Sequence, residues 1–126
     1  MKTIIETSAA PSPVGPYNQA ILAGNTLYIS GQIAIHQPTG KIINTTIEEE
    51  TRQVMENLGH ILKEAGLGYE NIVKCSVFVS DMDQYAAING VYAAYFNDDT
   101  APARELVEVA NLPKFVNVEI SAIAVK

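Results

Sequence analysis

The segment between Thr46 and Gly66 constrains the fold of this chain more than any other. Thr46 and Glu49 have the Ser/Thr-x-x-Glu spacing that caps the start of a helix. Gly66 supplies the left-handed residue with which many helices end. Between them, apolar and small residues recur at helical spacing, at Ile47, Thr51, Val54, Leu58, Ile61, Leu62 and Ala65. Residues 47–65 are therefore predicted to form an amphipathic helix with one face to bury.

A second helix is predicted for residues 82–96. Asp81 and Asp83 resemble a cap with acidic groups at the positive end of the helix dipole, ahead of a run of apolar and aromatic residues. The apolar segment 72–79, which lies between the two helices, is predicted to be a strand. Two helices separated by a strand can bury their apolar faces against one side of the same sheet.

The remaining segments predict further strands. Gly24-Asn25 suits a tight hairpin turn with positive φ angles, and 37–40 reads as another turn. The strands are expected at 2–6, 18–23, 26–31, 41–43, 104–109 and 115–125. The prediction is one α+β domain over residues 1–126, a two-layer sandwich in which a mixed sheet of about six strands carries two helices on one face.

The last predicted strand indicates how its two faces are used. Its even positions, from Val116 to Ala124, are uniformly apolar and are expected to face the helices. Its odd positions mix Asn117, Glu119 and Ser121 with apolar residues. A half-polar second face on so small a protein suggests an interface between copies of the chain.

Composition excludes several classes of function. With 126 residues, 48% of them hydrophobic, the chain suits one domain, and its net charge of −6 disfavours nucleic acid as a partner. No apolar run approaches the length of a membrane span, and no export signal is expected. The single Cys75 cannot form an intramolecular disulfide, so the expected compartment is the reducing cytosol.

Few residues could carry chemistry. The sequence has no phosphate-binding glycine loop, metal-binding spacing or nucleophile-elbow motif. His60 is interpreted as an exposed helical residue, His36 as a turn residue that is equally well plain surface, and Cys75 as a buried small hydrophobe. These residues predict neither a metal site nor a cofactor.

Arg104 and Glu119 are the two candidates that remain. Arg104 opens a strand after the loop 97–103, where its guanidinium could bind a carboxylate. An ion pair with Glu105, Glu108, Asp98 or Asp99 is the competing explanation. Glu119 could be a general base or could neutralise a basic residue across an interface. These residues alone leave the function open.

Several motifs closely resemble the reactive imine/enamine deaminase (RidA) family, which is also described as the L-PSP endoribonuclease or translation-inhibitor family. The motifs are GPYNQA at 15–20, YISGQI at 28–33 and PARELVEV at 102–109, followed by LPK at 112–114 and VEI at 118–120. Segments 51–58 and 89–96 are similar to the two helices of that family. The resemblance implies a chorismate-mutase-like fold that forms a homotrimer, with clefts between subunits and no cofactor.

The resemblance also implies roles for individual residues. Arg104 would clamp the substrate carboxylate together with the backbone N–H of Leu106, and Glu119 would position or activate water. Tyr17 would be the cleft tyrosine and the third catalytic residue beside Arg104 and Glu119. Ser30, Gly31 and Asn89 would be further substrate-binding elements, although Gly31 could serve only a bend and Asn89 only a tie between helix and loop. The chain departs from the family pattern at Asn18, often Ser, and at Leu106, often Cys, which puts substrate preference in question.

The activity that follows is hydrolysis of reactive 2-imino and enamine acids, such as 2-aminoacrylate, to 2-keto acids and ammonia. One alternative is a regulatory module that binds small carboxylates such as keto acids without turnover. Another is ribonuclease or translation-inhibitor activity, which has been attributed to some members of the family, but the net charge of −6 argues against it.

Overall fold

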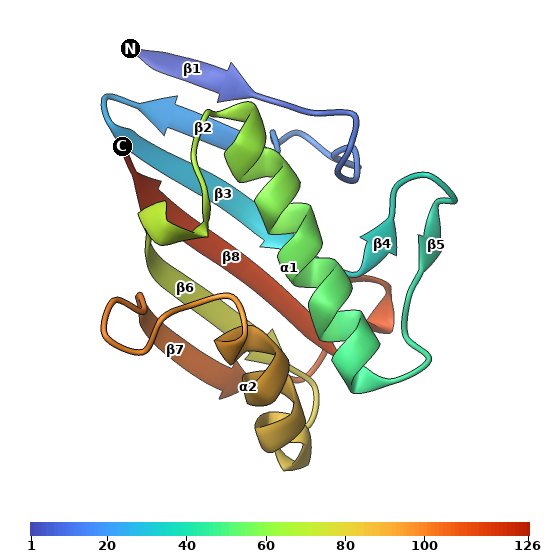
Figure 1. The fold of residues 1–126 in the computed structure, drawn as a ribbon. Helices are drawn as coiled ribbons and strands as arrows, with labels where there is room; N and C mark the ends of the chain where they lie inside the picture. The colour runs from blue at the N-terminus through green and yellow to red at the C-terminus, as the bar shows by residue number, and fades with distance from the viewer.

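The computed structural model describes residues 1–126 and places both helices on one face of a six-stranded sheet (Figure 1). The strands lie in the order β1-β2-β3-β8-β6-β7. Their bounds are Lys2–Ile5, Ala20–Ala23, Thr26–Gln32, Val118–Val125, Ile72–Val79 and Ala103–Glu108 in that order. Only β6 and β7 pair in parallel, so the sheet is mixed. The predicted two-layer α+β sandwich is confirmed.

The predicted hairpin at Gly24-Asn25 and the predicted turn at 37–40 are both present. β2 and β3 are joined through Gly24 and Asn25, and only Gly24 has a positive φ, of 60°. This is the arrangement of a two-residue turn with glycine at its first central position. The turn at 37–40 joins two further short strands, β4 (Ile35–His36) and β5 (Lys41–Ile42), which form a separate two-stranded sheet.

Helix α1 (Ile47–Glu64) follows its sequence signals closely. The Thr46 hydroxyl accepts a hydrogen bond from the backbone N–H of Glu49 at 3.1 Å, as the cap requires. The chain leaves the helix at Ala65 and turns through Gly66, whose φ is 75°. The prediction for this helix is confirmed to within one residue, because its start and end signals are both local. None of the helices is long and apolar enough to cross a membrane.

The prediction of one continuous helix over 82–96 is wrong at both ends. Residues Met82–Gln84 form a 3₁₀ turn, and helix α2 covers only Tyr85–Ala93. The Asp81 carboxylate accepts from the N–H of Asp83, which tightens the first turn. After Ala93 each backbone N–H donates to the carbonyl oxygen three residues earlier, as in a 3₁₀ turn. Here Tyr95 packs on Tyr69, with the ring centroids 4.9 Å apart. That packing explains the early end.

The predicted strand 115–125 is three residues too long. Pro113–Phe115 form a 3₁₀ turn in which Lys114 and Phe115 both have φ of 54°, and β8 begins at Val118. Because Pro113 has no N–H, it cannot donate a hydrogen bond to a neighbouring strand, and the chain can turn at this position without losing one. Val116 was predicted to face the helices as part of this strand. It is buried, but it lies before the strand begins.

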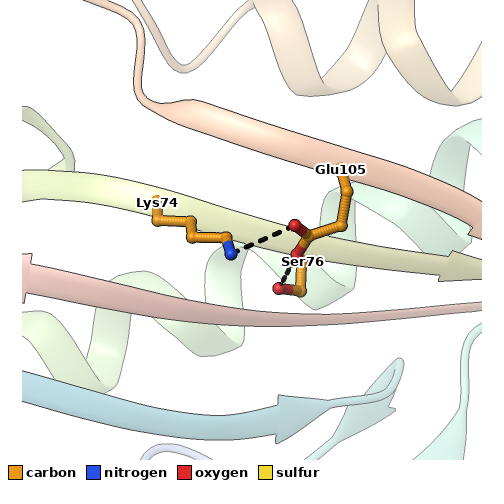
Figure 2. A network of polar contacts seen from close by, with 3 residues as sticks. All are labelled: Lys74, Ser76 and Glu105. Atoms are coloured by element: carbon orange, nitrogen blue, oxygen red, sulfur yellow. Dashed lines mark hydrogen bonds and ion pairs between the residues drawn. The ribbon is translucent and has the colours of Figure 1, made fainter.

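The core lies between the helices and the sheet. The four even positions of β8, Val118 to Ala124, are buried as predicted, together with Cys75 and Val77 of β6. The odd positions Glu119, Ser121 and Ile123 are half-buried on the opposite, open face. Figure 2 shows the polar network on this open face, where the Lys74 ammonium lies 3.1 Å from the Glu105 carboxylate and Ser76 donates to the same carboxylate.

The open face also exposes large apolar side chains. Register places Ile4 and Tyr28 there with Val107, and these side chains are about half exposed. The expectation that this face contacts other copies of the chain stays a prediction.

Candidate active site

Arg104 sits on the helix side of edge strand β7. In the parallel pairing with β6 it lies beside Cys75, whose side chain is buried under the helices. Its Nη1 donates to the Asn89 side-chain oxygen at 2.8 Å, and its Nη2 donates to the Tyr85 hydroxyl at 3.1 Å. The centre of the guanidinium lies 4.8 Å from the Tyr92 ring centroid, a cation–π distance. The guanidinium is therefore held in one orientation.

All three supports come from one face of α2. Tyr85, Asn89 and Tyr92 are spaced by four and three residues, which brings their side chains to the same side of a helix. Tyr92 is buried, and no group accepts from or donates to its hydroxyl. Burial also raises the pKa of Tyr92, so this phenol stays neutral beneath Arg104. The helix thus offers Arg104 two polar contacts and an aromatic surface, none of them charged.

No carboxylate pairs with Arg104. The ion pair considered for it with Glu105, Glu108, Asp98 or Asp99 is absent, because the single salt bridge of the structure joins Lys74 to Glu105. Glu105 points to the open face, and Glu108 accepts from the N–H of Met82 at 2.9 Å. The positive charge of Arg104 is therefore oriented but not neutralised. An anion is the partner that such a group lacks.

A cavity of about 230 Å³ adjoins Arg104. Its other walls come from the end of α2 and the following loop, and they are Asn89, Tyr92, Ala93, Phe96, Asp98, Ala101 and Pro102. Leu106 lies two residues along β7. The N–H of Val109 donates to the Val79 carbonyl oxygen at 2.9 Å, so it points toward β6. Successive N–H groups of an edge strand point alternately toward and away from the neighbouring strand, and the N–H of Leu106 therefore points away from β6, at the free edge of the sheet. This N–H can supply the second donor expected at that position.

Glu119, Gly31 and Tyr17 line a different cavity, of about 130 Å³. Tyr17 is 49% exposed and comes from the proline-rich loop before β2. Lys114 and Pro113 of the turn before β8 complete one wall. Burial raises the pKa of the Glu119 carboxyl above its usual range, because partial removal from water disfavours the charged form. The structure thus brings three of the predicted residues together, and burial gives the Glu119 carboxyl a pKa above that of an exposed glutamate.

Gly31 has a function beyond a bend. A Cβ built on Gly31 would lie 2.8 Å from the carboxyl carbon of Glu119, closer than atoms can approach. The Glu119 side chain therefore rests directly over the backbone of β3. Any larger residue at position 31 would displace the carboxylate.

Two buried or half-buried side chains fix the loop that carries Tyr17. The Gln19 amide donates to Thr7, Ala10 and Pro11 carbonyl oxygens and accepts from the N–H of Thr7 at 2.7 Å. Ser30, predicted as a pocket element, donates its hydroxyl to the Asn18 carbonyl oxygen at 2.6 Å. Ser30 thus ties β3 to this loop.

Glu50 of α1 was not identified from the sequence, where it looks like one more acidic residue in a first helical turn. It is fully buried, and its carboxylate accepts from the backbone and side-chain N–H groups of Asn117, at 2.7 and 2.8 Å, and from Val118. These bonds fix the start of β8 immediately before Glu119. Only the tertiary structure could show this, because the two segments are 67 residues apart.

Arg104 and Glu119 lie on opposite faces of the sheet. Arg104 shares the face of Cys75 and Val77, whereas Glu119 pairs with Phe78 on the open face. Asn89 and Leu106 accompany Arg104, whereas Tyr17 and Gly31 accompany Glu119. A single chain therefore presents the candidate residues as two separate groups, the Arg104 half-site and the Glu119 half-site.

The remaining candidates do not join either half-site. Cys75 is fully buried and burial raises the pKa of its thiol, which confirms its interpretation as a small hydrophobe. His60 is exposed on α1 as expected, and it lines a cavity with the half-buried His36. No group of three or more His, Cys, Asp or Glu side chains is arranged to hold a metal ion.

The fold and the two half-sites define a small α+β protein with an arginine that no carboxylate neutralises and, on the other sheet face, a half-buried carboxyl whose pKa is raised. Residues 7–126 match the family described as Endoribonuclease L-PSP. A RutC family protein of Synechocystis is 53% identical, over 97% of this chain and 95% of its own length. A Capra hircus protein named 2-iminobutanoate/2-iminopropanoate deaminase is 43% identical, over 100% and 91%. The chain belongs to this family, the RidA family that its motifs resemble.

A solved structure supports the same assignment. Escherichia coli TdcF with bound serine superposes with a TM-score of 0.92 at 41% identity, and the match covers 98% of each chain.

Proposed function

We propose that this protein hydrolyses 2-imino acids to 2-keto acids and ammonia, with Arg104 as the anchor for the substrate carboxylate. The observation that carries the proposal is the Arg104 guanidinium, which is fixed by Asn89, Tyr85 and Tyr92 but has no carboxylate partner. The relative named as a 2-iminobutanoate/2-iminopropanoate deaminase and the TdcF structure with bound serine support a small carboxylate ligand of this kind.

The complete site is proposed to form between two copies of the chain, in a homotrimer. One copy contributes Arg104, Asn89 and the N–H of Leu106, and its neighbour contributes Glu119 and Tyr17. The opposite orientation of Arg104 and Glu119 in one chain supports this arrangement. The open sheet face, with its exposed apolar side chains and the Lys74–Glu105 pair, is the surface proposed to pack between copies.

In the proposed reaction, Arg104 and the Leu106 N–H orient the carboxylate so that C2 of the imine lies near a water molecule held by Glu119. The water oxygen forms a bond to C2 of the protonated imine, and its proton passes to the Glu119 carboxylate. Glu119 then returns this proton to the nitrogen of the carbinolamine. The C–N bond breaks to release ammonia, and the hydroxyl proton passes to the Glu119 carboxylate as the C=O bond of the keto acid forms. Because the pKa of Glu119 is raised, this carboxylate is a stronger base than an exposed one.

This scheme needs no covalent intermediate. Imines hydrolyse unaided in water, so the barrier needs only modest lowering and a small set of groups suffices. Leu106 replaces a common family cysteine, and the proposed contact at this position comes from the backbone. The substitution is therefore proposed to change which substrate side chains fit. The cytosol is the proposed compartment, consistent with a free, buried Cys75.

The test is trapping of unreacted imine. An amino-acid oxidase generates 2-iminopropionate or a branched imino acid in the presence of semicarbazide, and semicarbazone formation is followed by absorbance. Wild-type protein should lower semicarbazone formation, and Arg104→Ala should not. Arg52→Ala, which removes an exposed arginine from α1, is the matched control and should behave as wild type. Equal semicarbazone yield with and without wild-type protein would contradict the proposal.

A carboxylate-binding module without turnover would give that negative result while still binding keto acids, which titration of 2-oxobutanoate detects. Endoribonuclease activity, the activity in the family description, is less compatible with a net charge of −6. RNA cleavage that persists in Arg104→Ala purified free of nuclease would favour it.

A further inference from the structure

Tyr85 is the contact of Arg104 that the motifs did not indicate. Its hydroxyl accepts from Nη2 of Arg104 at 3.1 Å, and the centre of the guanidinium lies 5.8 Å from its ring centroid. The side chain is 40% exposed, whereas Tyr92 on the same helix face is 6% exposed. The two tyrosines beside Arg104 therefore differ in access to a ligand.

The Tyr85 hydroxyl has a donor that the protein does not use. A phenol carries one O–H donor and can also accept, and here Arg104 donates to the oxygen. No other group of the chain bonds to this hydroxyl. Because the guanidinium repels the phenolic proton, the O–H points away from Arg104. It can then donate to an anion bound beside Arg104.

Asn89 likewise accepts a hydrogen bond from Arg104 and keeps free donors. Its side-chain oxygen accepts from Nη1 of Arg104 at 2.8 Å, which leaves the amide N–H groups as donors. Both polar supports of Arg104 are thus neutral groups that accept from the cation and retain donors of their own. A carboxylate support would instead cancel the charge and repel an anionic ligand.

We propose that the Tyr85 hydroxyl binds the substrate carboxylate, as a donor added to Arg104 and the Leu106 N–H. This inference rests on the proposed function for the identity of the substrate. It assigns Tyr85 to ground-state recognition of the carboxylate, away from the reacting carbon. Loss of the hydroxyl should therefore raise KM and leave kcat unchanged.

The experiment compares wild type with Tyr85→Phe, which keeps the ring and removes the hydroxyl. Tyr95→Phe is the matched control, because its hydroxyl donates to Glu56 at 2.7 Å, away from Arg104. Binding of 2-oxobutanoate is measured by calorimetric titration, and KM and kcat are measured in the imine-trapping assay. Circular dichroism checks that each variant is folded.

Tyr85→Phe should weaken 2-oxobutanoate binding and raise KM by about tenfold, as expected for one hydrogen bond to a charged group. Tyr95→Phe should match wild type in both. If Tyr85→Phe binds 2-oxobutanoate as tightly as wild type, or if wild type does not bind it, the inference is overturned. Weaker binding by Tyr85→Phe in a protein without deaminase activity would support the anion site and refute only the proposed reaction.

Discussion

The Arg104 half-site and the Glu119 half-site differ in how their charged groups are held. Arg104 has two hydrogen bonds and an aromatic ring beneath it, all from α2. The Glu119 carboxylate has no hydrogen-bond partner in the chain and lies over the backbone of Gly31 in a cavity. The first arrangement keeps a permanent charge in a fixed orientation. The second shifts a pKa upward through burial.

Under the proposed function, this difference separates binding from chemistry. A guanidinium does not change its charge near neutral pH, so the rigid Arg104 half-site can only bind and orient. A carboxyl with a raised pKa can exchange a proton, so the Glu119 half-site can assist bond making and breaking. Substitutions in the two half-sites should therefore affect different kinetic parameters.

The largest effect is expected for Arg104→Ala. Loss of the charge-assisted contact to a carboxylate should lower kcat/KM by about a hundredfold or more, because hydrogen bonds to charged groups contribute roughly 1.5–3 kcal/mol each. The fold should be unchanged, since Arg104 is outside the core cluster. Imine trapping gives the rate, and Arg52→Ala is the control. Retention of wild-type kcat/KM would remove Arg104 from the site.

Glu119→Gln should instead lower kcat, by about ten- to a hundredfold, with 2-oxobutanoate binding largely kept. Wild-type kcat should fall as pH drops through the raised pKa of Glu119, because the protonated carboxyl cannot accept a proton from water. The variant should lack this acidic limb. A pH–rate profile checks both points, and the same limb in the variant would assign it to another group.

The same pKa shift has a consequence for stability. Because its pKa is raised in the folded state, Glu119 binds its proton more tightly there than in the unfolded chain. The free energy of unfolding therefore decreases as pH rises from the pKa of Glu119 in the unfolded chain to its higher pKa in the folded protein. Glu119→Gln should therefore be slightly more stable than wild type at neutral pH. Urea titration measures the difference, and dissociation or unfolding of Glu119→Gln would assign Glu119 a structural role.

A smaller effect on turnover is expected for Gly31→Ala. The new methyl group would push the Glu119 carboxylate aside, so kcat should fall about tenfold while 2-oxobutanoate affinity is kept. Gly90→Ala is the control, because a Cβ there meets nothing within 4 Å, and alanine should stabilise α2 by about 0.5–1 kcal/mol. Equal kcat values for Gly31→Ala and wild type would show that the carboxylate can move without cost.

The smallest effect within one chain is expected for Glu105→Gln on the open face. The hydrogen bond from Ser76, followed by Lys74, lowers the pKa of Glu105, but the group is exposed and its pairing contributes little to the folding of a single chain. If this face packs between copies, the variant should weaken assembly instead. Sedimentation velocity at decreasing concentration distinguishes these results, and an unchanged oligomer would place Glu105 outside the interface.

The sequence predicted those parts of the molecule whose signals are local. Thr46 and Gly66 bound α1, and Gly24 marks the first hairpin, because caps and turns depend on neighbouring residues alone. The start of α2 was missed because Met82–Gln84 form a 3₁₀ turn after Asp81, and its end was missed because packing of Tyr95 on Tyr69 competes with continued helix.

The sequence named candidate residues, and the resemblance placed the clefts between subunits, but neither indicated which face of the sheet each residue occupies. The face of the sheet on which Arg104 lies depends on its register with Cys75, which is set by long-range pairing. Tyr85, Tyr92 and Glu50 carry no signal beyond ordinary aromatic and acidic residues, and their roles follow from contacts with distant segments.

The most direct test of a site shared between copies is complementation between Arg104→Ala and Glu119→Gln. Each variant alone should keep no more than about a tenth of wild-type activity. When the two variants are mixed after unfolding and refolded together, about a quarter of the sites of the proposed trimer should recover activity. In those sites an intact Arg104 of one copy meets an intact Glu119 of the next. Activity no higher than the average of the two separate variants would contradict the account, because it would place both residues in one chain's site.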